Sequence, residues 1–247
     1  DTNSGFKNGF EVLPLRLIMK AIVTGGTGFV GANLVRALLA EKHEVAVLLR
    51  GQSQKWRVEE ILHRMTPIIS DLSDPESLAD AIDRFKPDVI FHLAAYGSYP
   101  QNEKDIGQMV RTNILGTINL LDAAGNIPVI NTGSSSEYGI KNRKMREDDA
   151  CWPDNFYGWT KLSQTLYSLL KSVVTLRLFH AYGPWEEPTR LFPRLIRSKI
   201  KESPVALINS VRDFIYVDDV TKAFFRAFEK YETLRGQVIN IGTGKQT

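Results

Sequence analysis

The chain alternates between short apolar runs and longer stretches of helical periodicity. Apolar runs of four to six residues lie at 20–24, 44–49, 67–70, 89–93, 129–132 and 173–178. Helical stretches are predicted between them at 29–41, 75–85, 105–124, 157–170 and 217–231; in the first, Val30, Leu34 and Leu38 share one face. Strands that alternate with helices need crossover connections. The pattern therefore predicts a doubly wound α/β fold, in which helices cover both faces of a parallel sheet.

The last part of the chain departs from this regularity. Residues 191–204 and 208–216 read as helix and short strand pieces of a smaller lobe. We expect a large domain over 19–180, the smaller lobe mainly over 181–237 with 213–231 returning to the large domain, and a final strand of the large domain at 238–244. Residues 1–18 precede a start-like Met19 and are read as an extension or tag of unknown role. The tight connection after residue 170 and the end soon after Gly244 suggest that loops or a C-terminal segment are missing.

Composition excludes several classes of protein. The hydrophobic content of 43% is too high for a disordered chain, and no apolar stretch reaches the roughly 18 residues that cross a bilayer. The single Cys151 allows no internal disulfide, which fits the reducing cytoplasm, and four scattered histidines predict no metal site. The net charge of +3 comes from dispersed basic residues, which is not the pattern of a nucleic-acid-binding protein.

A glycine-rich turn joins the first predicted strand to the first predicted helix. Glycines at 25, 28 and 31 allow a sharp turn and close approach of the backbone to a pyrophosphate, and the helix N-terminus offers free N–H groups to the anion. This strand–turn–helix context predicts a dinucleotide-binding domain at 19–180. The predicted contacts in the turn are Gly25, Thr27, Gly28, Phe29, Val30 and Gly31.

The end of the second predicted strand bears on the choice of cofactor. A carboxylate at that place would bind the ribose 2′-OH of NAD, but the sequence has Arg50 there and no acid. An arginine can pair with a 2′-phosphate. The sequence therefore favours NADP, with NAD as the alternative, unless Arg50 is only a surface residue of a turn.

Several motifs in a fixed order resemble a known family. The segments are 25–31, Asp71-Leu72, His92-Leu93-Ala94-Ala95, 157–161, 177–184 and 212–220. Together they resemble the extended short-chain dehydrogenase/reductases, and within them the NAD-dependent epimerase/dehydratase group that acts on nucleotide sugars. The resemblance extends over nearly all of the chain from Met19 to Gly244.

The resemblance implies roles for single residues. Asp71 and Leu72 would flank the adenine, although Asp71 could instead cap the helix that begins near Pro75. The strand end at Leu93, Ala94 and Ala95 would lie beside the cofactor's phosphates and ribose, and Asn113 would support the cofactor and the active site. On the substrate side it implies contacts from Arg212 and from His180, where the family usually has asparagine. It also implies a homodimer.

Tyr157 and Lys161 are four residues apart in a helical stretch, so they share one face. A tyrosine hydroxyl with its ordinary pKa of about 10 is a poor base, and a neighbouring ammonium favours the phenolate. By the resemblance, Tyr157 moves the hydroxyl proton while hydride passes between sugar and nicotinamide, and Lys161 also holds the nicotinamide ribose. The resemblance also implies a serine or threonine at the end of the fifth predicted strand, which would hydrogen-bond the reacting oxygen. Counting back from Tyr138 selects Ser134, and aligning on Glu137 selects Ser135.

The residues after this serine bear on the reaction type. Sugar-nucleotide dehydratases commonly carry an Asp-Glu pair there, whereas this chain has Ser135-Ser136 in one alignment and Ser136-Glu137 in the other. We expect a cytoplasmic NAD(P)-dependent oxidoreductase that reduces a 4-keto group of a nucleotide-linked sugar. The alternatives are an NAD-dependent epimerase or dehydratase of nucleotide sugars and, from another class, a non-catalytic cofactor-binding regulator.

Overall fold

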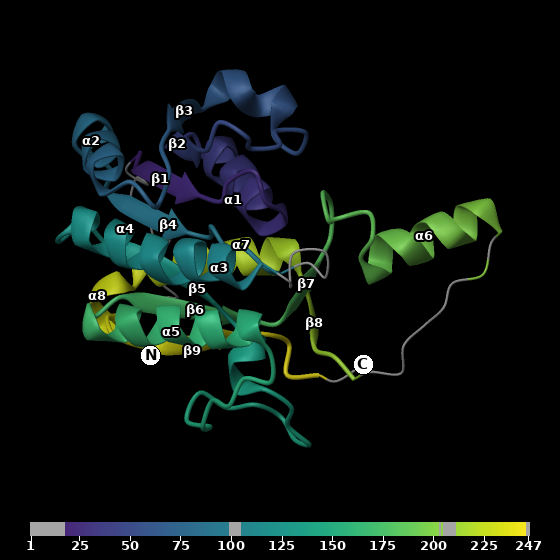
Figure 1. The fold of residues 1–247 in the computed structure, drawn as a ribbon. Helices are drawn as coiled ribbons and strands as arrows, with labels where there is room; N and C mark the ends of the chain where they lie inside the picture. The colour runs from purple at the N-terminus through teal and green to yellow at the C-terminus, as the bar shows by residue number, and fades with distance from the viewer. Residues whose placement is uncertain (1–17, 99–104, 203, 205–210, 246–247) are drawn as a thin grey trace, which may run out of the picture.

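The computed structural model describes residues 18–98, 105–202, 204 and 211–245 (Figure 1). Nearly all of the predicted extension at 1–18 lies outside the described residues, as do the first three residues of the predicted strand piece at 208–216. Within the described part of the chain, no helix is long and apolar enough to cross a membrane.

A parallel sheet of seven strands forms the centre of the molecule, in the order β3-β2-β1-β4-β5-β6-β9. Parallel strands that are covered on both faces need apolar side chains on both faces, and the strand sequences meet this need. In β1, Ala21 and Val23 face one hydrophobic cluster while Ile22, between them, faces the other. The strands are β1 (Lys20–Thr24), β2 (Glu44–Leu49), β3 (Thr66–Ile69), β4 (Val89–His92), β5 (Val129–Ser134), β6 (Val174–Leu178) and β9 (Val238–Ile241).

Helices cover both faces of this sheet, so the predicted doubly wound fold is confirmed (Figure 1). On one face, α1 contributes Leu34 and Leu38 and α7 contributes Phe224 to the larger cluster. On the other, α2 and α4 pack through Leu78 and Leu120. The helices of the body are α1 (Phe29–Ala40), α2 (Pro75–Phe85), α3 (Ile106–Met109), α4 (Gly116–Ala124), α5 (Phe156–Leu170), α7 (Val217–Glu229) and α8 (Tyr231–Leu234).

The structure departs from the sequence pattern in a few local features. The stretch predicted as one helix over 105–124 contains a π-helical turn, η3 (Val110–Leu115), between α3 and α4. A 3-10 helix, η1 (Glu59–Arg64), was not predicted. The helix α2 is capped by Asp74, whose carboxylate accepts from the Ser77 backbone N–H at 3.1 Å, so capping by Asp71 is wrong.

The smaller lobe has a short parallel sheet of its own, in which β7 (His180–Tyr182) pairs with β8 (Phe214–Tyr216). The ring of Phe192, from α6 (Leu191–Lys201), stacks on Tyr182 and meets Phe214 edge-on, with centroid distances of 4.3 Å and 5.1 Å. In Figure 1, α6 extends away from the layered body. The chain then returns to the body: α7 packs against α1, and β9 pairs with β6.

Candidate functional site

The glycine-rich turn is shaped by the lack of side chains at two positions. Gly25 has φ +69°, and a Cβ there would lie 2.6 Å from the Ala94 backbone nitrogen. A Cβ on Gly31 would overlap the Gly25 carbonyl group, with 2.8 Å to its carbon. The Gly28 N–H donates to the Gly25 oxygen at 2.9 Å, and α1 begins directly after Gly28. The turn therefore brings the N-terminus of α1 close to the end of β1, with Thr27, Phe29 and Val30 alongside.

The end of β4 closes the other side of this turn. Leu93 N–H donates to the Thr24 oxygen at 3.2 Å, and Ala94 N–H donates to the Thr24 hydroxyl at 3.1 Å. These bonds hold Leu93, Ala94 and Ala95 beside Gly25, so that a bound group at the turn would meet mostly backbone. Such a surface suits a pyrophosphate.

Arg50 and Asp71 follow the neighbouring strands β2 and β3 and are both exposed. Asp71 accepts hydrogen bonds from the backbone and the hydroxyl of Ser73, both at 2.8 Å. Partial burial opposes ionisation of Asp71, but these bonds and the charge of Arg50 outweigh it and hold the pKa of Asp71 below its usual value. Arg50 and Asp71, both predicted to lie on the adenosine side of the cofactor, are thus close enough for their charges to interact. Leu72 follows Asp71 directly in the sequence.

Lys161 is almost completely buried, with 2% of its surface exposed. Its ammonium donates to the Thr132 carbonyl and to the Gln164 side chain, both at 2.5 Å. Burial lowers the pKa of Lys161 to about 8, and the negative charge of Glu137 opposes that shift. Tyr157 lies one turn earlier on α5, whose N-terminus is capped by Asn155 through a 2.8 Å bond from the Gly158 N–H.

A series of buried hydrogen bonds connects the Lys161 ammonium, through two side-chain amides, to the neighbouring strand β6. The Gln164 side chain donates to Asn131 at 2.7 Å, and Asn131 donates to the Thr175 hydroxyl at 3.2 Å. Sequence reasoning missed these positioning residues. The available signal was a polar residue inside an apolar strand, Asn131, together with a glutamine one turn after the lysine.

The two candidate serines follow one another at the carboxyl end of β5. Ser134 is the last residue of the strand, and Ser135 is the first of a 3-10 helix, η4 (Ser135–Tyr138). The Ser134 hydroxyl accepts from the Ser136 N–H at 3.1 Å, and Glu137 accepts from the Ser134 N–H at 2.7 Å, which completes a capping box. The structure thus places both serines at the carboxyl end of the strand whose Thr132 carbonyl accepts from Lys161.

Glu137 is fully buried and forms an ion pair with Arg177, with Oε2 to Nε at 2.8 Å. Both of its oxygens therefore already have partners within the protein. A carboxylate in this state is not available to take a proton from a substrate. Glu137, the acid that would follow the serine if Ser135 is the catalytic one, thus faces the protein interior.

Two further buried side chains connect β4 to the helices around α5. The Asn113 amide, in the π-helical turn, donates to the Tyr96 carbonyl and the Thr160 hydroxyl, both at 2.9 Å, and accepts from the Tyr96 N–H at 2.8 Å. His92 lies 2.7 Å from the Thr24 hydroxyl and 2.9 Å from that of Thr117. Burial and the nearby Lys161 charge lower the pKa of His92 to about 3, so the ring is neutral. Asn113 thus contacts protein groups on three sides, consistent with a supporting position.

The predicted substrate residues His180 and Arg212 come together in the smaller lobe. Arg212 Nη1 lies 2.5 Å from His180 Nε2. Burial and the charges of Arg212 and Arg190 lower the pKa of His180 to about 4. The neutral ring therefore accepts a hydrogen bond from the guanidinium.

The segment 184–190, which we call the strap, is tied to three parts of the large domain. Asn33 on α1 donates to the Pro184 carbonyl at 3.0 Å. Arg57, after β2, donates to the Trp185 carbonyl and to Glu187, both at 2.8 Å. Arg190 reaches back to the Ser98 carbonyl, after β4, at 2.5 Å. The strap therefore connects α1, which follows the glycine-rich turn, with the segments that follow β2 and β4, the two strands on either side of β1.

No group of histidine, cysteine, aspartate and glutamate side chains among the described residues could hold a metal ion.

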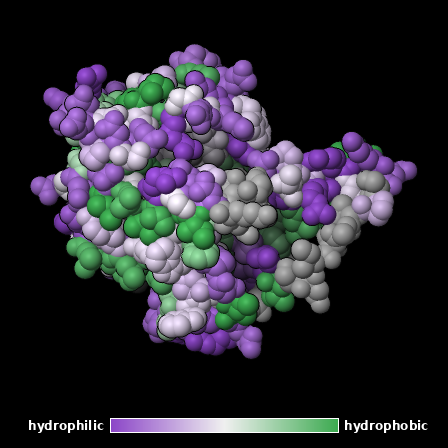
Figure 2. Space-filling model, in the orientation of Figure 1, coloured by the Kyte–Doolittle hydropathy of each residue, from purple (hydrophilic) through white to green (hydrophobic). Residues whose placement is uncertain are grey.

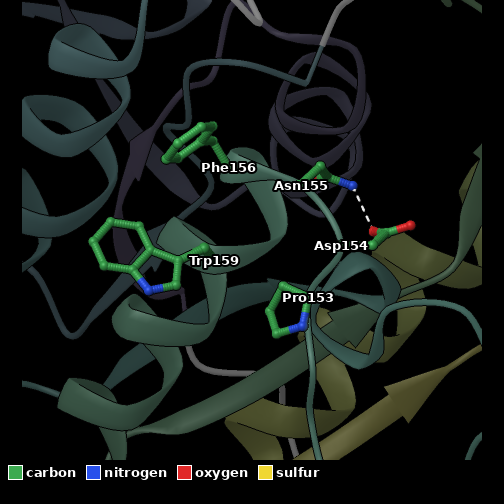
Figure 3. A pocket seen from close by; sticks show the side chains of 5 residues that line it. All are labelled: Pro153, Asp154, Asn155, Phe156 and Trp159. Carbon is green, nitrogen blue, oxygen red and sulfur yellow. Dashed lines mark hydrogen bonds between the residues drawn. The ribbon is translucent and has the colours of Figure 1, made fainter.

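A hollow of about 350 Å³ lies at the start of α5, beside Tyr157 in the sequence. Figure 3 shows Phe156 and Trp159 at this hollow, with Asn155 donating to Asp154 at 2.9 Å.

Comparisons with known proteins agree with this geometry. Residues 21–242 match the sequence profile of the NAD dependent epimerase/dehydratase family. UDP-N-acetyl-alpha-D-glucosaminuronate decarboxylase of Bacillus cytotoxicus is 30% identical, with 91% of this chain and 75% of the relative covered. GDP-6-deoxy-D-talose 4-dehydrogenase of Aggregatibacter actinomycetemcomitans is 31% identical, with 92% and 75% covered. The crystal structure of UDP-glucuronic acid 4-epimerase from Bacillus cereus with UDP-glucuronic acid and NAD has a TM-score of 0.79 at 31% identity, with 93% and 79% covered.

Proposed function

This chain is an enzyme of the NAD-dependent epimerase/dehydratase family, and on that premise we propose that it transfers hydride between a nicotinamide cofactor and a carbon of a nucleotide-linked sugar. The observation that carries the proposal is the position of three features along one edge of the sheet. The glycine-rich turn, the serines and the buried Lys161 all lie at or beside the carboxyl ends of parallel strands. Ligands of open α/β sheets bind at that edge.

In the proposed reaction, Tyr157 exchanges a proton with the sugar oxygen while hydride moves to or from the nicotinamide. The Lys161 ammonium favours the Tyr157 phenolate and holds the nicotinamide ribose, and Ser134 or Ser135 donates to the reacting oxygen. The nicotinamide cofactor supplies or accepts the hydride. The residues proposed to hold it are the glycine-rich turn, Arg50, Asp71, Leu72, Leu93, Ala94, Ala95 and Asn113.

We favour reduction of a 4-keto sugar among the reactions of the family. The engaged state of Glu137 supports this choice, because dehydration across a carbon–carbon bond needs a further acid–base group near the serine. Epimerisation with a retained cofactor is the second candidate, supported by the 4-epimerase among the structural neighbours. A reductase consumes reduced cofactor stoichiometrically, whereas an epimerase does not.

The choice of dinucleotide is a separate proposal. The B. cereus neighbour was crystallised with NAD, whereas exposed Arg50, in the place of an acid, favours the 2′-phosphate of NADP. The nearby Asp71 carboxylate partly neutralises Arg50, which weakens this preference. Turnover with NADPH and NADH should be compared in wild type and in Arg50→Ala. A preference for NADPH that the substitution removes supports NADP, and a preference for NADH that the substitution leaves unchanged contradicts it.

The decisive experiment is a panel of UDP-, GDP- and dTDP-linked sugars, including 4-keto-6-deoxy sugars. Each is incubated with reduced cofactor while the absorbance of the reduced nicotinamide is followed. We expect turnover with at least one keto sugar and a loss of about 10²-fold or more in Tyr157→Phe, with cofactor binding unchanged. Undiminished turnover in Tyr157→Phe would contradict the mechanism. Comparison of Ser134→Ala with Ser135→Ala identifies the serine, because one of the two is expected to lower kcat much more.

We also propose that the protein forms a homodimer through α5. Phe156, Trp159, Leu166 and Leu170 of this helix are 54%, 49%, 54% and 82% exposed. Figure 2 shows hydrophobic residues gathered over α4 and α5 on one face of the molecule. An apolar patch of this kind on a helix favours burial against a second copy.

A further inference from the structure

Glu137 connects the candidate serine Ser134 with Arg177 on the neighbouring strand β6. It is fully buried in η4, directly beyond the end of β5. Its Oε1 accepts from the Ser134 N–H at 2.7 Å, and its Oε2 accepts from Arg177 Nε at 2.8 Å. A buried carboxylate is stable only when its oxygens are paired in this way.

The first consequence concerns the candidate serines. Glu137 and Ser134 form a reciprocal capping box that fixes the first turn after the strand. The space behind the strand end is filled as well, because a Cβ on Gly133 would lie 2.7 Å from Glu137 Oε1. The backbone position of Ser134 therefore depends on the Glu137 side chain, while the Ser134 hydroxyl accepts from the Ser136 N–H at 3.1 Å.

The second consequence concerns the ammonium of Lys161. Lys161 donates to the Thr132 carbonyl, two residues before the Ser134 N–H that donates to Glu137, so both charges lie at the same strand end. Burial of Lys161 lowers its pKa, and the negative charge of Glu137 opposes that shift. The other groups near this region are the neutral His92 from β4 and the Arg177 guanidinium from β6, and Tyr157 lies one turn before Lys161 on α5. None of these three supplies a fixed negative charge beside the ammonium.

We propose that Glu137 is a positioning residue for the acid–base reaction, which fixes the backbone of Ser134 and places a carboxylate at the strand end that binds the Lys161 ammonium. This proposal rests on the proposed function, since it concerns how the Tyr157–Lys161 pair is kept ready. Arg177 completes the arrangement: it binds Glu137 on one side and donates to the Tyr138 hydroxyl at 2.7 Å on the other.

The test is Glu137→Gln, because glutamine keeps an acceptor for the Ser134 N–H and removes the charge. Protein with ¹³C-labelled lysine is titrated by NMR, and the Lys161 signal is assigned with Lys161→Met. We expect Lys161 to titrate near its pKa of about 8 in wild type and at distinctly lower pH in Glu137→Gln. An unchanged Lys161 titration in the folded variant overturns the proposal.

The matched control is Asp122→Asn, which removes a carboxylate that pairs with Lys171 at 2.7 Å, beside Tyr167 and away from β5's carboxyl end. It is expected to leave the Lys161 titration as in wild type. If the unpaired Arg177 prevents folding of Glu137→Gln, the reciprocal measurement is made in Lys161→Met. The pKa of Glu137 is then measured by ¹³C-carboxyl NMR, and we expect it to be higher than in wild type. No change in that pKa also overturns the proposal.

The catalytic readout separates positioning from a purely structural role. With a substrate from the panel, Glu137→Gln should lower kcat, leave KM for the cofactor unchanged and move the alkaline limb of the pH–rate profile to lower pH. A uniform loss of activity with an unmoved limb overturns the proposal. The NMR titrations need no substrate, so failure of the proposed function leaves them interpretable.

Discussion

Gly31 offers a quantitative test of the glycine-rich turn. In Gly31→Ala, the added methyl group meets the Gly25 carbonyl and the Gly26 backbone, atoms that cannot rotate out of the way. Overpacking of this kind costs up to about 3 kcal/mol, and alanine in place of glycine in a helix returns about 1 kcal/mol. We therefore expect a net loss of about 2 kcal/mol in the free energy of unfolding, from the balance of those two terms.

For a chain of this length, that loss corresponds to a decrease in Tm of about 4–8 °C, measurable by scanning calorimetry. Since α1 must move away from the turn, the affinity for the dinucleotide should fall by about tenfold or more, equivalent to about 1.4 kcal/mol or more, measurable by titration calorimetry. Gly51→Ala is the matched control, because no atom lies within 4 Å of its added Cβ. If Gly31→Ala matches Gly51→Ala in both Tm and affinity, the close contact between α1 and the turn is not what shapes the site.

Three other predictions test separate parts of the structure. Arg57→Ala should lower the free energy of unfolding by about 1–3 kcal/mol, because it removes a nearly buried guanidinium together with its hydrogen bonds to Glu187 and the Trp185 carbonyl. Exposed Arg226→Ala should change it by less than about 0.5 kcal/mol, and equal denaturation midpoints for the two variants would contradict the role of the strap. His92 takes up its proton at pH about 3 when folded but near 6.5 when unfolded, so stability should fall as the pH drops from 6.5 toward 3, by up to about 1.4 kcal/mol per pH unit. His92→Leu should flatten this slope, and an unchanged slope from urea unfolding at several pH values would contradict it. Leu166→Asp should shift the protein toward monomer in light scattering, and a monomeric wild type would exclude the dimer through α5.

The periodic parts of the fold could be predicted from the sequence almost to the residue. The range 75–85 is that of α2, and all six apolar runs predicted as strands end within two residues of the observed strand ends, because these runs are stopped by glycines, polar residues or turns. The predicted helix at 105–124 was less accurate. Its periodicity gives no sign of the π-helical turn, in which Asn113 donates to Tyr96 and Thr160, residues distant in sequence.

The candidate site could be predicted only where local sequence decides the chemistry. The glycines of the turn and the Tyr157–Lys161 spacing are local signals. The state of Glu137 is not, because its partner Arg177 lies 40 residues away in sequence and on another strand. The same is true of the strap, where Arg57 and Glu187 are separated by 130 residues. Such pairs are set by the packing of the whole chain, which no short pattern records.

The bond from Lys161 to the Thr132 carbonyl has a consequence for how this molecule can vary. The anchor of the ammonium, Thr132, and the candidate serines lie within three residues of each other at the end of one central strand, β5, which has neighbours on both sides. Their spacing is thus independent of the outer loops and of the smaller lobe. Substitutions in those regions can change which molecule is admitted while the spacing of the reactive groups stays the same.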